Sequence, residues 1–249
     1  MKIESYKKKK SNIYEITFDN KDKISLFDDV ILKYELLLKK EIDNKELENI
    51  INDNNKLESY YVALKYISTK LRTRKEIRNK LKGYPKLVVD STIKRLEEEK
   101  YLNDDIYIKS YINDSINLKL VGPNKIQFEL KNLGFDLNII NNYLNKIDED
   151  IWIEKIEKYI KKKIDVNHNL SGIVLKQKII SDLISKGFFK ETIDNIIDTY
   201  EFNDDDKIYE KEYNKIKNKL SKKYSGEELE YHLRMNLYKK GFTNKKIDY

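Results

Sequence analysis

The stretch ALKYISTKLRTRKEIRNKLKGY, residues 63–84, decides the fold because its ending, a glycine followed by an aromatic residue, recurs along the chain. The four pairs are Gly83-Tyr84, Gly134-Phe135, Gly187-Phe188 and Gly241-Phe242. Their glycines are 51, 53 and 54 residues apart. A nearly fixed period of this length indicates a repeat architecture.

Each repeat is predicted to contain a helix, a polar break, a second helix that ends at the glycine, and a third helix. A glycine after a helix lets the chain turn left-handed without a Cβ clash, and we expect this at all four positions. The other three glycines, Gly122, Gly172 and Gly226, come 12 to 15 residues earlier, at the break before the second helix. Thr73 and Glu76 have capping-box spacing, which Ser225 and Glu228 repeat.

The sequence therefore predicts a mainly α fold in which tandem three-helix, helix-turn-helix-like repeats form an elongated array. We expect the repeats at 57–102, 103–147, 148–202 and 203–249, the last one truncated. Residues 1–56 are predicted to form a small cap of a β-hairpin plus short helices. In it, IYEITF and ISLF flank a polar turn at 20–22, helices cover 28–38 and 44–52, and 52–55 is a linker.

Composition excludes several classes of protein. No stretch approaches the roughly 20 consecutive apolar residues of a membrane span, and no apolar segment follows the basic run at 7–10 as in a signal peptide. The chain has no cysteine, which excludes disulfides and thiol chemistry. We expect a cytoplasmic protein that does not contact the membrane.

No residues predict catalysis or a cofactor. The sequence contains no nucleophile–base constellation, dinucleotide fingerprint or phosphate loop. The acidic clusters at 103–105, 148–150 and 204–206 each precede the first helix of a repeat, where negative charge favours a helix N-terminus, so we interpret them as caps rather than metal ligands. His168 and His232 lie far apart in the repeats. We expect that the protein is not an enzyme and that it binds no metal or cofactor.

The charge is concentrated in the first repeat. Residues 57–102 contain 12 basic and 6 acidic side chains, which supplies most of the net charge of +7, whereas 148–201 is net acidic. On the predicted second helix, Arg74, Arg78 and Lys82 are four residues apart and share a face. Arginine suits bidentate recognition of carboxylates or phosphates, so we interpret this cluster as a binding face; the alternative is a merely solvated basic face.

The same region resembles the RecX family, bacterial regulators of the RecA recombinase. The likeness is carried by the following segments: Ala63-Leu64, RTRKEIR at 72–78, Lys80-Leu81, LNDD at 102–105, Gly122-Pro123, Lys125-Ile126, Glu129-Leu130 and Gly134. Two positions depart from the family pattern. The chain has Ile106-Tyr107-Ile108 where the family commonly has Phe-Ala, and Asn132-Leu133 where it commonly has two basic residues.

The resemblance implies a protein that binds the RecA–DNA filament and inhibits recombination, with no catalysis of its own. The partner-binding residues are then expected to be Arg72, Arg74, Lys75, Arg78, Lys82 and Lys125. The partners are the RecA filament and, as a secondary contact, single- or double-stranded DNA; we expect a monomer. Two alternatives stay open: a direct DNA-binding protein that uses its helix-turn-helix-like repeats, and a helical-repeat scaffold for another partner.

Overall fold

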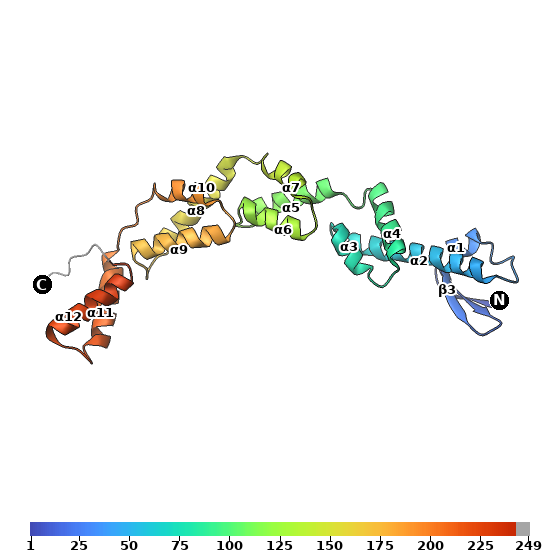
Figure 1. Cartoon of the computed structure of the whole chain (residues 1–249), viewed down its shortest axis with the longest axis horizontal. Helices are drawn as coiled ribbons and strands as arrows, with labels where there is room; N and C mark the ends of the chain where they lie inside the picture. Colours follow the sequence, from blue (N-terminus) through green and yellow to red (C-terminus); the bar gives the residue numbers. More distant parts are fainter. Residues whose placement is uncertain (243–249) are drawn as a thin grey trace. The chain divides into compact units, whose positions relative to one another are not determined.

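The computed structural model describes residues 1–242, and the chain divides into two compact units, Met1–Lys109 and a second that begins at Ser110 (Figure 1). The first unit contains β1 (Ile3–Lys10), β2 (Ile13–Phe18), β3 (Lys23–Phe27), α1 (Asp28–Lys33), α2 (Asn44–Ile67), α3 (Arg74–Lys80) and α4 (Lys86–Glu98). The boundary falls within α5 (Asp104–Leu118). The second unit continues with α6 (Pro123–Asn132), α7 (Leu137–Leu144), α8 (Glu149–Asp165), α9 (Gly172–Ser185), α10 (Lys190–Ile197), α11 (Asp206–Leu220) and α12 (Gly226–Lys239). The mainly helical fold class is confirmed.

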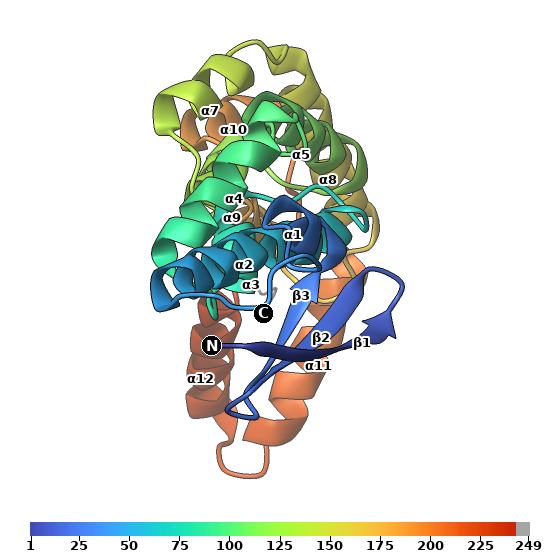
Figure 2. The same cartoon turned by 90° about the vertical axis from the view of Figure 1, so that its right-hand side faces the viewer.

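The N-terminal cap is a three-stranded antiparallel sheet in the order β1-β2-β3 (Figure 2). The predicted hairpin is confirmed as β2 and β3, but the prediction of only two strands was wrong. β1 lacks the alternation of apolar and polar residues that predicts a strand, because it is nearly all exposed and ends in four lysines. Lysines on an edge strand discourage pairing with other chains, so the run has a structural reason.

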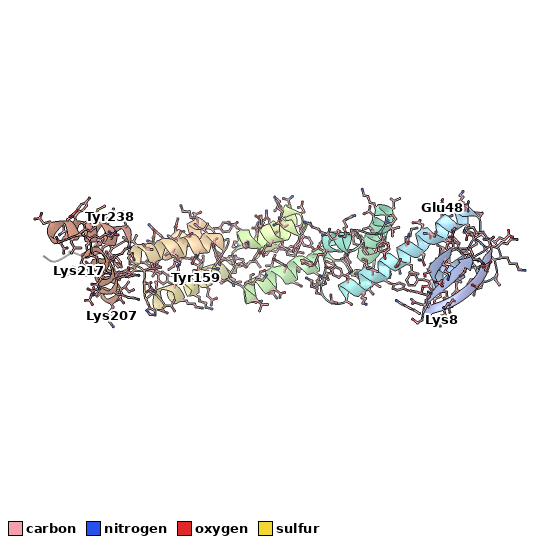
Figure 3. All side chains as sticks on the ribbon, turned by 90° about the horizontal axis from the view of Figure 1, so that it is seen from below. Lys8, Glu48, Tyr159, Lys207, Lys217 and Tyr238 are labelled. Carbon is pink, nitrogen blue, oxygen red and sulfur yellow. The ribbon has the colours of Figure 1, made fainter. Side chains whose placement is uncertain are left out.

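The predicted linker at 52–55 was wrong, because these residues lie inside α2, one continuous helix of 24 residues (Figure 3). Asn54 is 8% exposed, accepts a hydrogen bond from the Phe27 amide at 2.9 Å and donates one to the Ser25 carbonyl at 3.2 Å. Neighbouring Asp53 accepts hydrogen bonds from Lys33 and Tyr34. These tertiary bonds outweigh the weak helix propensity of an Asn-rich segment.

The first helix of the cap is shorter than predicted. α1 ends at Lys33, and Glu35 has a left-handed φ of 51°. The limit expected between the cap and the first repeat, at 56–57, falls inside α2. The limits predicted between the repeats, at 102–103, 147–148 and 202–203, stay predictions.

Helices α2, α3 and α4 surround a core that includes Ile77 and Leu81, both fully buried. α3 begins at a complete capping box, in which the Thr73 side chain accepts from the Glu76 amide and the Glu76 carboxylate accepts from the Thr73 amide. That prediction is confirmed. The box predicted at Ser225 was wrong, since Ser225 is the N-cap of α12 but makes no capping hydrogen bond. The acidic clusters do cap helices: Asp148 begins α8 and Asp205 begins α11.

The recurring glycines do not all have the same role. Gly134, Gly187 and Gly241 have left-handed φ angles of 100°, 86° and 84°, as predicted, but Gly83 does not, so that prediction was wrong. The backbone of Gly187 also lies close to α6, because a Cβ at this position would lie 2.3 Å from the Lys125 backbone nitrogen. Hydrogen bonds from the Gly122 amide to Lys186 and from the Asn124 amide to Gly187 join the start of α6 to the end of α9.

In the second unit α6 packs on α7, α8 contacts α9 and α10, and α11 pairs with α12. The last pair encloses a small core that includes Ile208, Leu233 and Phe242. The final turn predicted for the truncated fourth repeat, 243–249, lies outside the described residues. Among residues 1–242 no helix combines the length and apolar character needed to span a bilayer.

Candidate partner-binding surface

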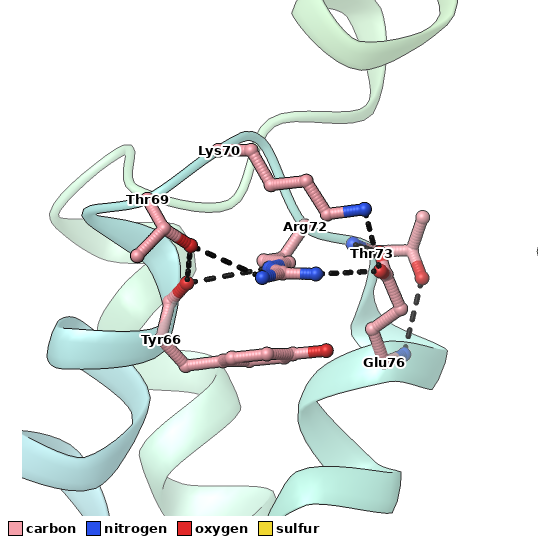
Figure 4. Close-up of polar contacts among 6 residues, drawn as sticks. All are labelled: Tyr66, Thr69, Lys70, Arg72, Thr73 and Glu76. Atoms are coloured by element: carbon pink, nitrogen blue, oxygen red, sulfur yellow. Dashed lines mark hydrogen bonds and ion pairs between the residues drawn. The ribbon is translucent and has the colours of Figure 1, made fainter.

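Arg72 lies in the turn between α2 and α3, and its side chain contacts residues of the turn and of both helices (Figure 4). Its guanidinium stacks on the Tyr66 ring at 3.6 Å and donates to the Tyr66 carbonyl at 3.2 Å. Further bonds reach Glu76 at 3.2 Å and the Thr69 hydroxyl at 3.1 Å, and only 12% of the side chain is exposed. Arg72 therefore ties the turn to the start of α3.

Glu76 connects this arrangement to the cap of α3. Burial raises the pKa of its carboxyl, but the Thr73 amide, Arg72 and Lys70 outweigh that effect and lower the pKa below its ordinary value. The Lys70 ammonium lies 3.7 Å from the same carboxylate. A single carboxylate thus forms ion pairs with both Arg72 and Lys70.

Arg74 and Arg78 project from successive turns of α3 and are about half exposed. Arg74 forms ion pairs with Glu97 of α4 and with Asp104 at the start of α5. Burial opposes its charge, but the hydrogen bonds to Asp104 and Glu97 raise the pKa of Arg74 above its ordinary value.

Arg78 pairs with Asp90 of α4. Its partner, like those of Arg74, comes from a neighbouring helix rather than from α3 itself. The two guanidiniums are therefore oriented by carboxylates that flank the surface.

Lys75 and Lys82 are exposed beside the two arginines. α3 ends at Lys80, so the prediction that Lys82 continues its helical row was wrong; the sequence Gly83-Tyr84-Pro85 stops the helix early. Of the residues that the structure describes, none forms an ion pair with Lys82. We use the name basic surface for Arg74, Lys75, Arg78 and Lys82.

Lys125 belongs to α6 of the second unit and is 42% exposed in its side chain. Its ammonium lies 4.0 Å from Glu129 and 5.7 Å from the Phe128 ring centroid. Arg72 and the four residues of the basic surface thus lie in the first unit, while Lys125 lies in the second.

Sequence reasoning missed the acids that flank the basic surface and an exposed leucine at the start of α4. Asp90, Glu97 and Asp104 are distant in sequence from the arginines they bind, so no local pattern indicates the pairing. Leu87, next to Lys86 at the start of α4, is 84% exposed. It could have been found, since it falls off the buried stripe of α4.

The described residues show no group of three or more histidine, aspartate or glutamate side chains arranged to hold a metal ion. What the basic surface can do chemically is bind anions. A guanidinium has five N–H donors, so it can keep its intramolecular acid and still donate to a partner's carboxylate or phosphate.

Comparison with known proteins places this surface in a recognised domain. Residues 60–96 match the family model described as RecX, first three-helix domain. The regulatory protein RecX of Streptococcus agalactiae (serotype III, strain NEM316) is 30% identical over 253 residues, covering 99% of this chain and 97% of the relative. That of Limosilactobacillus reuteri (strain DSM 20016) is 28% identical over 247 residues, covering 97% and 92%. A solved structure, a crystal structure of regulatory protein RecX, is 26% identical and superposes with a TM-score of 0.66 over 80% of this chain and 100% of its own.

Proposed function

We propose that this protein, which belongs to the RecX family of regulatory proteins, binds the RecA–DNA filament and inhibits its recombinase activity. The observation that carries the proposal is the basic surface, which lies within the matched first three-helix domain. The relatives are named as regulators, in agreement with a protein that acts by binding rather than by catalysis.

The arginines suit recognition of an anionic filament. Each guanidinium presents a planar fork of donors that matches a carboxylate or phosphate in two parallel hydrogen bonds. Glu97, Asp104 and Asp90 hold these forks in place before a partner arrives. Because less rotational freedom is lost on binding, preorganisation favours affinity. Arg72 is a positioning residue in this mechanism, since it fixes the turn from which α3 begins.

Direct DNA binding through a recognition helix is less well supported. α3 has seven residues, about 10 Å of helix. Both of its outward arginines are engaged by carboxylates of the same unit, which would repel a phosphate backbone. A filament offers protein surface as well as phosphates, so it suits a surface of mixed charge better than naked DNA does.

The test is co-sedimentation of the full chain with RecA filaments formed on single-stranded DNA, with naked single- and double-stranded DNA at the same salt concentration as controls. We expect the protein to pellet with the filament and to slow strand exchange and RecA ATP hydrolysis. Equal binding to naked DNA would favour the direct DNA-binding alternative. No binding to either would leave only the scaffold alternative.

A further inference from the structure

The second unit contains a groove of about 740 Å³ between the end of α5, with the residues that follow it, and one side of α8. Five lysines line it: Lys119, Lys155, Lys158, Lys162 and Lys163. Glu154 is the one acid in the lining of this groove. We call it the α8 groove; Tyr159, which also lines it, is labelled in Figure 3.

Two of the lysines lack a neutralising partner. The Lys155 ammonium donates to the Lys119 carbonyl at 2.8 Å, and burial, together with the charge of Lys158, lowers its pKa. Lys162 is exposed, and none of the described carboxylates pairs with it. In contrast, Lys158 lies 2.5 Å from Glu154 and Lys163 lies 3.8 Å from Asp182. The groove therefore keeps an excess of positive charge that an anionic ligand can neutralise.

Four apolar residues also line the groove, together with Asn117 and Tyr159. Ile116, Leu120 and Ile151 are half-buried, and Leu118 is 79% exposed. An exposed leucine next to unpaired lysines suggests a ligand that is both apolar and acidic. Its apolar groups would pack on the apolar residues of the lining, and its acidic groups would pair with the lysines.

The groove is poorly suited to nucleic-acid bases. Single-stranded nucleic acid usually stacks its bases on aromatic faces. Tyr159 is the aromatic residue that lines the groove, and its hydroxyl donates to Asp182 at 2.8 Å. The ammonium groups of Lys163 and Lys186 lie 5.2 and 5.9 Å from its ring centroid, so its face is already engaged.

We propose that the α8 groove binds an acidic, amphipathic helical segment of a partner protein. The apolar side chains of the segment pack on Ile116, Leu118 and Ile151. Its carboxylates pair with Lys155, Lys158 and Lys162, which face the groove from two turns of α8, a span of about 10 Å. This proposal goes beyond filament binding and does not rest on it, because the groove shares no residue with the basic surface and needs no nucleic acid.

The test measures fluorescence anisotropy of a labelled, stapled peptide with leucines on one helical face and glutamates on the other, added to the full chain. We expect saturable binding that weakens about ten-fold or more in Lys158→Glu/Lys162→Glu, which turns two attractions into repulsions. The control Lys161→Glu/Lys178→Glu makes the same charge change at exposed positions outside the lining, and should bind the peptide like the wild type.

Two further measurements keep the proposal falsifiable. Leu118→Gln changes an exposed side chain, so it should leave folding intact and weaken the peptide several-fold. A peptide with lysine in place of glutamate should bind the Lys158→Glu/Lys162→Glu variant better than the wild type. Absence of peptide binding, or equal binding by all variants, would overturn the proposal. So would an oligo(dT) probe that binds the wild type more tightly than the peptide and is lost in the same double variant.

Discussion

The basic surface of α3 and the α8 groove are both cationic, yet the two arginines of the first and two of the lysines of the second differ in how they are paired. Arg74 and Arg78 are each paired with carboxylates from neighbouring helices. Lys155 and Lys162 have no such partner among the carboxylates that the structure describes. Charge counts from the sequence would suggest that unpaired cations lie in the first unit, because residues 57–102 carry the basic excess and residues 148–201 are net acidic. A segment's charge count therefore does not reveal where unneutralised charge lies.

The two regions also use different cations for different purposes. A guanidinium can keep an intramolecular partner on one edge and still offer donors to a ligand, whereas an ammonium is a compact point charge on a flexible stem. The α3 arginines thus suit a geometrically defined contact, and the α8 lysines suit general attraction of an acidic segment. Each prediction below tests one side of this comparison.

The largest effect should come from reversing charge on the basic surface. Arg74→Glu/Arg78→Glu removes two charge-assisted contacts and introduces repulsion, so we expect filament affinity to fall about 100-fold or more, with inhibition of strand exchange lost. Co-sedimentation and RecA ATP hydrolysis measure this. Lys161→Glu/Lys178→Glu is the matched control and should retain inhibition. Full inhibition by the arginine variant would show that the basic surface is only a solvated face.

The second prediction concerns Arg72, the cation that is mostly buried in the fold rather than exposed on the basic surface. Arg72→Ala should lower the free energy of unfolding of the first unit by about 2 kcal/mol, because it removes three hydrogen bonds and the stack on Tyr66. Hydrogen exchange of the α3 amides measures this, with the α9 amides as an internal reference.

Lys162→Ala is the comparison for Arg72→Ala and should change stability by about 0.5 kcal/mol or less. Arg72→Lys should restore little, since an ammonium has neither the planar face nor the fork. Unchanged protection of α3 in Arg72→Ala would mean that the turn does not depend on this arginine.

The helical repeats could be predicted because hydrophobic period and glycine spacing are local signals. The buried stripe of α4, the cap at Thr73 and the left-handed Gly134 and Gly187 all follow from short-range patterns. Errors arose where distant contacts decide the structure. Asn54 is helical because it bonds to β3. Gly83 is a separate case: it is not left-handed, although an aromatic residue follows it as at the other three glycines.

The candidate site was predictable in composition but not in geometry. Five of the six candidate residues lie within eleven positions, and four of them are the exposed residues of the basic surface, whose role in binding stays a prediction. It could not indicate that Arg72 is held inside the fold or that Lys82 lies beyond the end of α3. The α8 groove could not be predicted from a local pattern, because its lining combines two segments that are distant in sequence, 116–120 and 151–163.

A smaller effect distinguishes geometry from charge on the basic surface. Arg74→Lys/Arg78→Lys keeps both positive charges but removes the bidentate forks, and we expect filament affinity to fall about ten-fold. The salt dependence of binding should change little, because the number of cations is unchanged. Wild-type affinity in this variant would show that simple electrostatic attraction suffices, which would make the basic surface equivalent to the α8 groove.

The smallest effect concerns a feature that both units share, a tyrosine whose hydroxyl donates to a carboxylate and whose ring lies close to a cation. In the first unit Tyr60 donates to Glu99 and the Arg95 guanidinium lies 3.7 Å from its ring centroid. In the second, Tyr159 donates to Asp182 beneath Lys163. Burial and the hydrogen bond to Glu99 raise the pKa of Tyr60 to about 12 from an ordinary value of 10.0. Burial and Asp182 likewise raise the pKa of Tyr159.

Tyr60→Phe removes one hydrogen bond while keeping the ring, so at neutral pH it should lower the free energy of unfolding by about 1 kcal/mol. Because the folded-state pKa of Tyr60 is the raised one, its stabilisation is complete below pH 10.0 and is lost as the pH rises through about 12. The stability difference between wild type and Tyr60→Phe, measured by urea unfolding, should therefore disappear over that interval. Tyr159→Phe should behave in the same direction in the second unit. A difference that stayed constant with pH would mean that the hydroxyl–carboxylate bond does not stabilise the fold and that the ring contacts alone account for the burial of Tyr60.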